Sequence, residues 1–248
     1  MTMSVQQLTE ILRNSNNVVF FGGAGVSTAS GIPDFRSANG LWNQKYKRNL
    51  SPEEMVSRSF FERDPGDFFA FYKDKLIYPE AKPNACHYAL AKLEKMGKLK
   101  AVVTQNIDGL HQMAGSTNVF ELHGSVLRNF CTRCHAFYGA DFILKSEGVP
   151  RCPKCGAVVK PDVVLYEEML DEDVIDGAVK AIAKADVLII GGTSLIVYPA
   201  AGFVRYFRGN KLVVINKSST QADDYADLVI HEDIASVMDQ AVKALEDL

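Results

Sequence analysis

The sequence predicts an α/β protein whose main part is a doubly wound parallel sheet, with a smaller helical and cysteine-containing module inserted. Three observations lead to this fold class. Short, continuously apolar runs alternate with helical patterns, a glycine-rich turn follows the first apolar run, and two Cys-x-x-Cys pairs interrupt the alternation. With 248 residues, the chain is long enough for one large domain or for a large domain plus a small insert.

The apolar runs define six predicted strands. The first run, 18–21, follows an amphipathic helix at the start of the chain, in which Val5, Leu8 and Leu12 recur at helical spacing. Apolar runs without polar alternation are typical of strands that are buried on both faces of a parallel sheet. The other five predicted strands span residues 101–104, 119–122, 187–190, 212–215 and 228–230.

Helical patterns separate the predicted strands. They cover residues 86–93, 174–185 and 234–245, and each has apolar residues at intervals of three or four. Two stretches break the alternation. We therefore expect one domain over 1–248, with a Rossmann-like part at about 1–36, 83–125 and 161–248, and a small module that is helical at about 37–82 and contains the cysteines, as a metal-binding segment, at about 126–160.

Composition and charge exclude several classes of function. Hydrophobic residues make up 47% of the chain and charged residues 23%, as in an ordinary soluble enzyme. The net charge of -3 provides no positive field for nucleic acid or an anionic membrane. The first ten residues are polar and no apolar stretch approaches about 20 residues, so neither a signal peptide nor a membrane span is predicted. We expect a cytoplasmic protein, with a monomer as the default state.

A glycine-rich turn at residues 22–27 follows the first predicted strand. Glycines there let a backbone approach a pyrophosphate, and a helix that begins just after them would supply free N–H groups. The pattern departs from that of dehydrogenases, because Thr28 stands in place of the third glycine. The acidic residue expected on the second strand is also missing, since that strand ends at 104–106. Taken alone, the turn fits a tight turn as well as a dinucleotide site.

Asp34, Phe35 and Arg36 follow the glycine turn in a predicted loop, because the Gly-Ile-Pro before them cannot prolong a helix. An arginine near a pyrophosphate forms bidentate, charge-assisted hydrogen bonds, and a phenylalanine can cover a flat heterocycle. A core phenylalanine and a surface ion pair are the alternative for either residue in isolation.

The second and third predicted strands end in residues suited to recognition or catalysis. Residues 104–109 place four polar side chains and a turn glycine at the end of the second strand, and His123 follows the third. A single histidine is more often structural than catalytic. The carboxyl ends of parallel strands meet at one edge of the sheet, however, so we expect His123 to lie beside Asn106 and Asp108.

Four cysteines form the most specific pattern. Cys131 and Cys134 make one Cys-x-x-Cys pair, Cys152 and Cys155 make another, and 17 residues separate the pairs. This spacing is typical of a zinc ion held by four thiolates. Four sulfur ligands leave no position for water, so we expect one structural zinc ion that stabilises a small insert. Cysteines without zinc, or a redox pair, are the alternative, and Cys86 is expected to be core.

Taken together, these motifs resemble the sirtuin family, in particular its single-domain bacterial and archaeal members. The matching strings are residues 23–37, 104–111 and 123–124, the two Cys-x-x-Cys pairs and residues 192–195, in the family's order. The resemblance implies an NAD-dependent protein-lysine deacetylase or deacylase. Such an enzyme uses NAD as a co-substrate, acts on acyl-lysine proteins or peptides, and forms nicotinamide and O-acyl-ADP-ribose.

The resemblance also implies roles for individual residues. His123 would be the general base, and Asn106 would order a water or the ribose. Val163, Val164 and Val197 would border the acyl-lysine tunnel. The implied NAD contacts are Ala24, Thr28, Phe35, Arg36, Gln105, Asn106, Ile107, Asp108, Thr193, Ser194, Asn216 and Ile234.

The sequence departs from the family pattern beside the expected peptide groove, where Tyr166 and Glu167 replace a phenylalanine and a glycine. The tyrosine and arginine of relatives that prefer acidic acyl groups are not evident after Ser37, since Tyr46 and Arg48 have a different spacing. Acetyl or longer neutral acyl groups are therefore expected. Two other functions are considered: protein mono-ADP-ribosyl transfer, and a non-catalytic zinc- and NAD-binding module. No direct contact with nucleic acid or membrane is expected.

Overall fold

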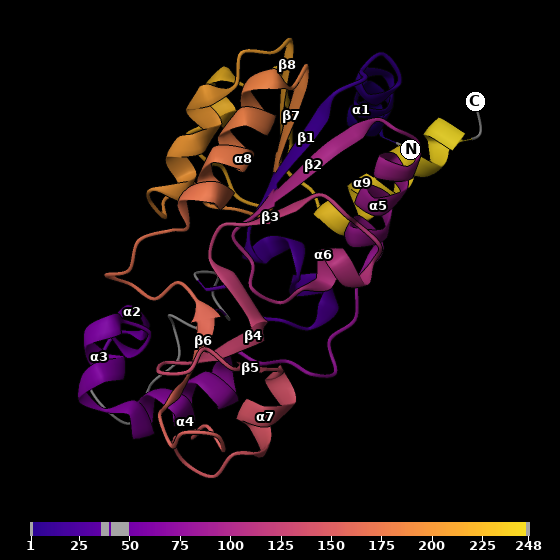
Figure 1. Ribbon diagram of the computed structural model, residues 1–248. Helices are drawn as coiled ribbons and strands as arrows, with labels where there is room; N and C mark the ends of the chain where they lie inside the picture. Colours follow the sequence, from indigo (N-terminus) through magenta and orange to yellow (C-terminus); the bar gives the residue numbers. More distant parts are fainter. Residues whose placement is uncertain (1, 36–39, 41–49, 247–248) are drawn as a thin grey trace.

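Two β-sheets organise the chain in the computed structural model, which describes residues 2–35, 40 and 50–246. The larger sheet has six parallel strands in the order β3-β2-β1-β7-β8-β9, and the smaller has three antiparallel strands in the order β5-β4-β6. Figure 1 shows the large sheet with its helices in one part of the molecule and the small sheet with α2, α3, α4 and α7 in another. The predicted fold class is confirmed.

All six predicted strands lie in the large sheet. The sheet's order reverses beside β1, whose neighbours are β2 and β7. At the carboxyl end of β1, Gly22 pairs with Thr104 of β2 on one side and with Gly191 of β7 on the other. A crevice at such a reversal is where ligands bind in open α/β sheets. The strands are β1 (Val18–Gly22), β2 (Leu99–Thr104), β3 (Val119–Glu121), β7 (Val187–Gly191), β8 (Lys211–Ile215) and β9 (Leu228–Ile230).

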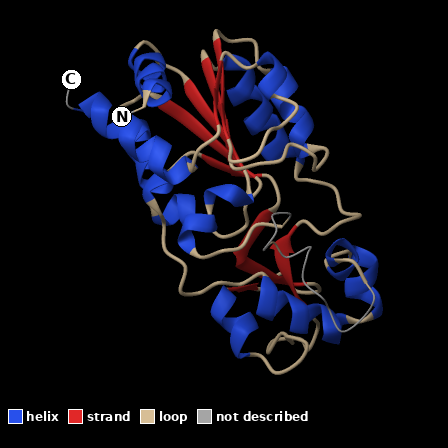
Figure 2. Cartoon of the chain, turned by 180° about the vertical axis from the view of Figure 1, so that it is seen from behind, coloured by secondary structure: helices blue, strands red, loops and turns tan. Residues whose placement is uncertain are grey.

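Helices cover both faces of this sheet (Figure 2). On one face α1 (Met3–Arg13), α5 (Ala85–Lys95) and α9 (Ile234–Glu246) share a hydrophobic core with the strands. On the other, α8 (Glu172–Lys184) and the 3-10 helix η4 (Ala200–Tyr206) complete a second core. The predicted helices are confirmed, and none of the described helices is long and apolar enough to cross a membrane.

The small module has a core of its own. Short helices α2 (Pro52–Met55), α3 (Arg58–Arg63), α4 (Pro65–Lys75) and α7 (Ala140–Lys145) surround its sheet. Tyr72 and three phenylalanines of α3 and α4 are almost fully buried against residues of the small sheet. Neighbouring aromatic rings meet edge to face or stacked, which adds to the stabilisation from burial. The helical and metal-binding segments, far apart in sequence, therefore form one unit.

The small sheet was not predicted. It consists of β4 (Gly124–Cys131), β5 (Phe137–Tyr138) and β6 (Val159–Val163). The pairing of β4 with β6 is irregular, because Ser125 lies opposite Asp162 while Asn129 lies opposite Pro161. Three residues of β4, 126–128, therefore bulge out of the ladder. β6 is an edge strand of this sheet.

Candidate active site and metal centre

One cavity of about 1030 Å³ lies where the carboxyl ends of the large sheet face the small module. Its wall includes residues of the β1, β2, β7 and β8 ends together with the segment that continues β6. Every described residue that the sequence suggested for cofactor, catalysis or substrate lines this cavity: Ala24, Thr28, Phe35, Gln105, Asn106, Ile107, Asp108, His123, Val163, Val164, Thr193, Ser194, Val197, Asn216 and Ile234. Arg36, Tyr46 and Arg48 lie outside the described residues.

The glycine-rich turn packs directly against the loop after β7. A Cβ atom at Gly25 would lie 2.8 Å from the Cα atom of Gly192, and one at Gly23 would lie 2.8 Å from the Cβ atom of Thr193. Only glycine allows this approach, which leaves backbone rather than side chain at the cavity wall. The expectation of a helix directly after the turn was wrong. Two 3-10 turns, η1 (Ala24–Val26) and η2 (Thr28–Ser30), occupy that place, so the dipole of a long helix cannot contribute.

The polar residues after β2 form a network with the glycine-rich turn. The Oγ atom of Ser27 donates to Oδ2 of Asp108 at 2.6 Å and accepts from Nδ2 of Asn106 at 3.0 Å. The second carboxylate oxygen of Asp108 accepts from the backbone N–H of Leu110. These bonds fix the orientation of two side chains that face the cavity. Sequence reasoning missed Ser27, although it belongs to the same glycine-rich string.

A second network joins the loops after β2, β7 and β8. Nε2 of Gln105 donates to Oγ1 of Thr193 at 3.0 Å. Asn216 accepts from the Thr193 backbone N–H at 3.1 Å and donates to its carbonyl at 2.6 Å. The three strand ends are therefore held in one arrangement around the cavity, as a preorganised binding site requires.

His123 lies at the edge of this arrangement and is half-buried. Its Nδ1 atom is 3.0 Å from the carbonyl oxygen of Gln105. Because a carbonyl can only accept, Nδ1 carries the proton and Nε2 is the free acceptor of the neutral ring. Burial lowers the pKa of His123, and the Gln105 bond opposes this only in part. The imidazole is therefore neutral at pH 7, with Nε2 able to take a proton.

The segment after β6 is held between His123 and the helical module. The backbone N–H of Val164 donates to the His123 carbonyl at 3.0 Å, and the N–H of Tyr166 donates to the Val56 carbonyl at 3.1 Å. Glu167 stands where the family pattern has a glycine, and local contacts explain how a glutamate is accommodated there. Its φ of 74° is left-handed, which costs a non-glycine residue roughly 1–2 kcal/mol, but its carboxylate accepts from the N–H and Oγ of Ser59, both at 2.9 Å.

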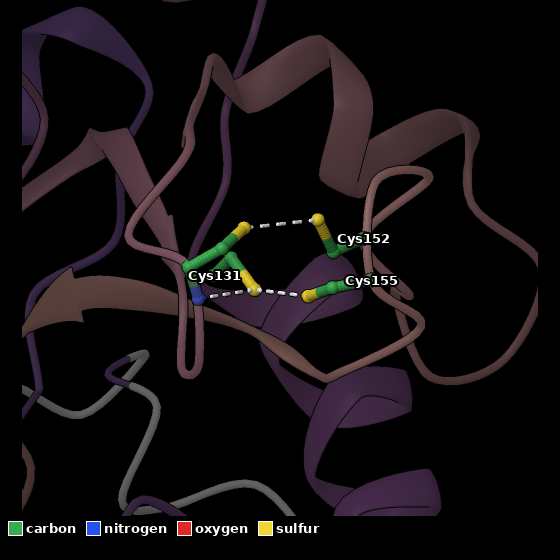
Figure 3. Close-up of side chains that lie close together, drawn as sticks. Cys131, Cys152 and Cys155 are labelled. Carbon is green, nitrogen blue, oxygen red and sulfur yellow. Dashed lines mark hydrogen bonds between the residues drawn. The ribbon is translucent and has the colours of Figure 1, made fainter.

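The four cysteines of the two pairs come together as predicted. Their sulfur atoms all lie within 4.8 Å of one another, with Cys131 to Cys155 at 3.3 Å and Cys134 to Cys152 at 3.6 Å. Figure 3 shows sulfurs from both knuckles turned toward one centre. Tetrahedral zinc with bonds of about 2.3 Å needs sulfurs about 3.8 Å apart, so the site fits one zinc ion.

Local hydrogen bonds favour the thiolate form of two of these cysteines, because they lower the pKa of Cys131 and Cys152. The hydrogen bond with the Tyr138 hydroxyl, 3.1 Å from the sulfur, lowers the pKa of Cys152 to about 6. In each knuckle the residue after the second cysteine is left-handed: His135 has a φ of 55° and Gly156 a φ of 77°. The two knuckles therefore turn in the same way around the metal position. The fifth cysteine, Cys86, is fully buried in the core of the large sheet.

Fold and site together define a dinucleotide-binding α/β protein with a four-cysteine zinc module and a histidine at the cavity. The model of the Sir2 family matches residues 23–199. The chain belongs to the Sir2 family.

Known relatives extend over nearly the whole chain. An NAD-dependent protein deacetylase of Clostridium perfringens is 70% identical over 239 residues, which cover 96% of this chain and 98% of that protein. One of Clostridium acetobutylicum is 57% identical, with the same coverage. A solved Sir2 structure with deacetylated p53 peptide and 3′-O-acetyl ADP-ribose is 39% identical at a TM-score of 0.88, and the match covers 98% of each chain.

Proposed function

We propose that this chain removes acetyl or another neutral acyl group from protein lysine side chains with NAD as co-substrate, forming nicotinamide, O-acyl-ADP-ribose and free lysine. One observation carries the proposal. A single cavity joins a glycine-rich dinucleotide turn, a neutral histidine and the edge of a small sheet. The relatives of more than 50% identity, which are NAD-dependent protein deacetylases, support the same activity.

We assign NAD to the part of the cavity that the large sheet forms. The turn at 23–25 would receive the pyrophosphate, with Thr28, Phe35 and Arg36 beside it. The Ser27–Asp108–Asn106 network would hold the nicotinamide ribose and carboxamide, since amide and carboxylate groups match the hydrogen-bonding groups of both. The remaining proposed contacts are Ala24, Gln105, Ile107, Thr193, Ser194, Asn216 and Ile234.

We assign the acyl-lysine peptide to the edge of the small sheet. Among the described residues β6 pairs on one side only, with β4, so an extended peptide can add to its other side by backbone hydrogen bonds. Val163 and Val164 would border the peptide on this wall, and Val197 would border it on the opposite one. The lysine side chain would then point toward His123, because Val164 is bonded to the His123 backbone.

In the proposed reaction the acyl oxygen attacks C1′ of the nicotinamide ribose and nicotinamide leaves. His123 then accepts a proton through the ribose hydroxyls, so that the 2′-oxygen can close on the acyl carbon. Water would then add to that carbon and the C–N bond to lysine would break, which releases the lysine amine and leaves O-acyl-ADP-ribose. Its neutral state and free Nε2 suit a base that works near pH 7. Asn106 would order a water or the ribose, and Phe35 would shield the intermediate from returning nicotinamide. The zinc is expected to hold the small module together and to take no part in proton transfer.

We further propose that the protein works in the cytoplasm as a monomer, on acyl-lysine proteins and without nucleic acid or membrane. The division into a Rossmann-like part (about 1–36, 83–125 and 161–248) and a small module (about 37–82 and 126–160) is likewise proposed. Separate cores support it, since the core of the small module is built from α2–α4, α7 and the small sheet.

The test mixes the protein with NAD and an acetyl-lysine peptide and follows nicotinamide, peptide mass and O-acetyl-ADP-ribose together. All three products should form in equal amounts. His123→Ala should lower the rate by roughly 10² to 10⁴-fold, the usual contribution of a general base. Zinc content and melting temperature serve as the control that this variant is folded.

Two other outcomes would redirect the assignment. Nicotinamide without deacetylated peptide would indicate another acyl group, or transfer of ADP-ribose to protein. Adenylate label retained on an acceptor protein would then identify the transferase. A folded, zinc-loaded protein that releases no nicotinamide would refute the catalytic assignment and leave a binding module.

A further inference from the structure

An arginine in the bulge of β4 bridges the two sheets. Nε of Arg128 lies 2.7 Å from Oδ2 of Asp162, and its Nη1 atom lies 2.6 Å from Oε2 of Glu121. Glu121 ends β3 of the large sheet, whereas Asp162 lies in β6 of the small sheet. One guanidinium group therefore connects the strand that precedes His123 with the strand proposed to bind the peptide.

The segment that carries His123 is held to β6 at both of its ends. Before His123, Glu121 is connected to Asp162 through Arg128. After it, Gly124 adopts a left-handed φ of 73° and lies so close to β6 that a Cβ atom would be 1.9 Å from the Asp162 carbonyl oxygen. The His123 carbonyl itself accepts from Val164. Contacts with residues 162–164 thus hold the backbone on both sides of His123, while the imidazole itself is bonded to the Gln105 carbonyl.

The irregular pairing of β4 makes the arginine contact possible. Residues 126–128 leave the ladder between Ser125 and Asn129, and the bulge is held by its own bonds. The N–H of Val126 donates to the Ile107 carbonyl at 2.9 Å. The bulge is thus fixed to the loop that follows β2, while Arg128 turns back toward β3 and β6.

The partners of Arg128 differ in exposure. The Glu121 side chain is only 8% exposed, whereas those of Arg128 and Asp162 are 41% and 43% exposed. A buried carboxylate requires a paired charge, and an exposed ion pair contributes little. Loss of the Arg128 charge would leave the Glu121 carboxylate uncompensated two residues before His123. The expected response is a shift of the turn between β3 and β4, which carries the base.

We infer that Arg128 is a positioning residue for His123: its guanidinium group holds the base in register with the peptide edge of β6. This inference rests on the proposed function. Arg128 touches neither substrate nor reacting atoms in this scheme. Its effect is confined to the step that needs His123, which follows the departure of nicotinamide.

The order of steps provides a readout that general destabilisation would not produce. Exchange of labelled nicotinamide into NAD, in the presence of acetyl peptide, requires only the steps before His123 acts. Deacetylation requires His123 as well. A displacement of about 1 Å can lower a rate by about 10²-fold. Arg128→Gln should therefore reduce deacetylation roughly 10- to 100-fold and change exchange by less than about 3-fold, with KM for NAD unchanged.

Three further variants complete the experiment. Arg128→Lys keeps the charge but loses the two-pronged contact, so its rate should fall between those of the parent and Arg128→Gln. Adding Glu121→Gln to Arg128→Gln removes the uncompensated carboxylate and should restore part of the deacetylation rate. Lys180→Gln is the matched control, since it removes one charge from an exposed pair on α8 with Asp176 and should leave both activities at the parental level.

The outcomes separate the inference from the proposed function. If Arg128→Gln lowers exchange and deacetylation by the same factor, or changes neither, Arg128 does not position His123. If Arg128→Gln does not fold, the same comparison is made with Arg128→Lys, and equal effects on both rates would again refute the inference. If the parent protein exchanges nicotinamide but never deacetylates, the proposed function fails instead, whatever Arg128 does.

Discussion

Two histidines packed against each other in the core should make the protein sensitive to acid. His87 of α5 and His111 of α6 (Leu110–Met113) are 0% and 1% exposed, with ring centroids 4.7 Å apart. Nδ1 of His87 accepts from the backbone N–H of Asn84 at 3.2 Å. Within the described part of the chain, no partner bonds the other three ring nitrogens. Both rings are therefore neutral, and a proton on either would be buried without a hydrogen-bonded carboxylate, although Asp108 lies near His87.

The size of the effect follows from the pKa values. Burial lowers the pKa of His87 to about 4 despite the nearby Asp108, and burial together with His87 lowers the pKa of His111 to about 3. In the unfolded chain each of the two histidines has a pKa of about 6.5. Below that pH the unfolded chain therefore binds more protons than the folded chain. Stability is fully present above pH 6.5 and is lost as the pH falls. At pH 5 the loss is about 2 kcal/mol for each histidine, a large part of a typical 5–15 kcal/mol.

Denaturant unfolding at pH 7.5 and pH 5.0 measures this loss in the parent and in His111→Leu. The leucine variant removes one titrating ring, so its stability should fall by about 2 kcal/mol less than that of the parent between the two pH values. Phe20→Leu is the control, because Phe20 packs 6.3 Å from His111 but does not titrate. It should lower stability by a similar amount at both pH values. Equal pH losses in the parent and in His111→Leu would refute this reasoning.

Three further predictions concern the backbone and the base. Gly124→Ala should lower the free energy of unfolding by about 3 kcal/mol or more, because the backbone of β6 fills the space for a Cβ atom. Gly115 also has a left-handed φ but has open space around it, so Gly115→Ala should lower the free energy of unfolding by only about 1 kcal/mol. Equal losses in the two variants would contradict this reasoning. Glu167→Gly should change unfolding stability by less than about 1 kcal/mol, since relief of the left-handed backbone offsets the lost Ser59 bonds, and Glu167→Ala should be the less stable of the two. The pH profile of kcat/KM, which reports groups of the free enzyme, should place the acidic limb of His123 below pH 6.5, because burial lowers its pKa. A limb above pH 7 would count against His123 as the base.

The large sheet could be predicted because its physical signal is local. The central strands are buried on both faces, so they read as continuous apolar runs, and every residue of β1 and β7 is buried. The helices between the strands pack on the faces of this sheet, so each has one apolar face and one polar face. The edge where parallel strands end then follows from topology, so residues after β1, β2, β3, β7 and β8 could be expected around one crevice.

The small sheet could not be predicted in the same way. β4 loses its period of two at the bulge, so it does not show the alternation that marks an antiparallel sheet. β6 does alternate in burial, but it is only five residues long and contains Pro161, which argues against a strand in the sequence. Cysteine spacing indicated the metal, but it does not specify the strands before, between and after the ligands. Pairings between distant residues were also missed. Ser27 meets Asp108 81 positions away, and Arg128 meets Asp162 34 positions away.

One strand, β4, connects the zinc site with His123, so the presence of the metal should affect the position of this histidine. β4 begins at Gly124, next to His123, and ends at Cys131, a proposed zinc ligand. Loss of the metal would release the Cys131 end of β4 and its pairing with β6, while the turn at 23–25 belongs to the large sheet and packs on the loop after β7. Zinc removal should therefore weaken peptide binding and the His123 step before it weakens NAD binding.

Cys155→Ser tests this separation, because it removes one ligand at the metal centre and leaves β4 itself intact. Metal analysis should show loss of zinc, and deacetylation should fall by more than about 10-fold, as expected when a base is no longer held in place. Calorimetric titration of NAD should give a Kd within about 3-fold of the parent, since the groups that line the dinucleotide side are anchored in β1, β2, β7 and β8. If NAD affinity is lost together with zinc, the two sheets do not fold as separable units, and the metal supports the whole cavity rather than the peptide side alone.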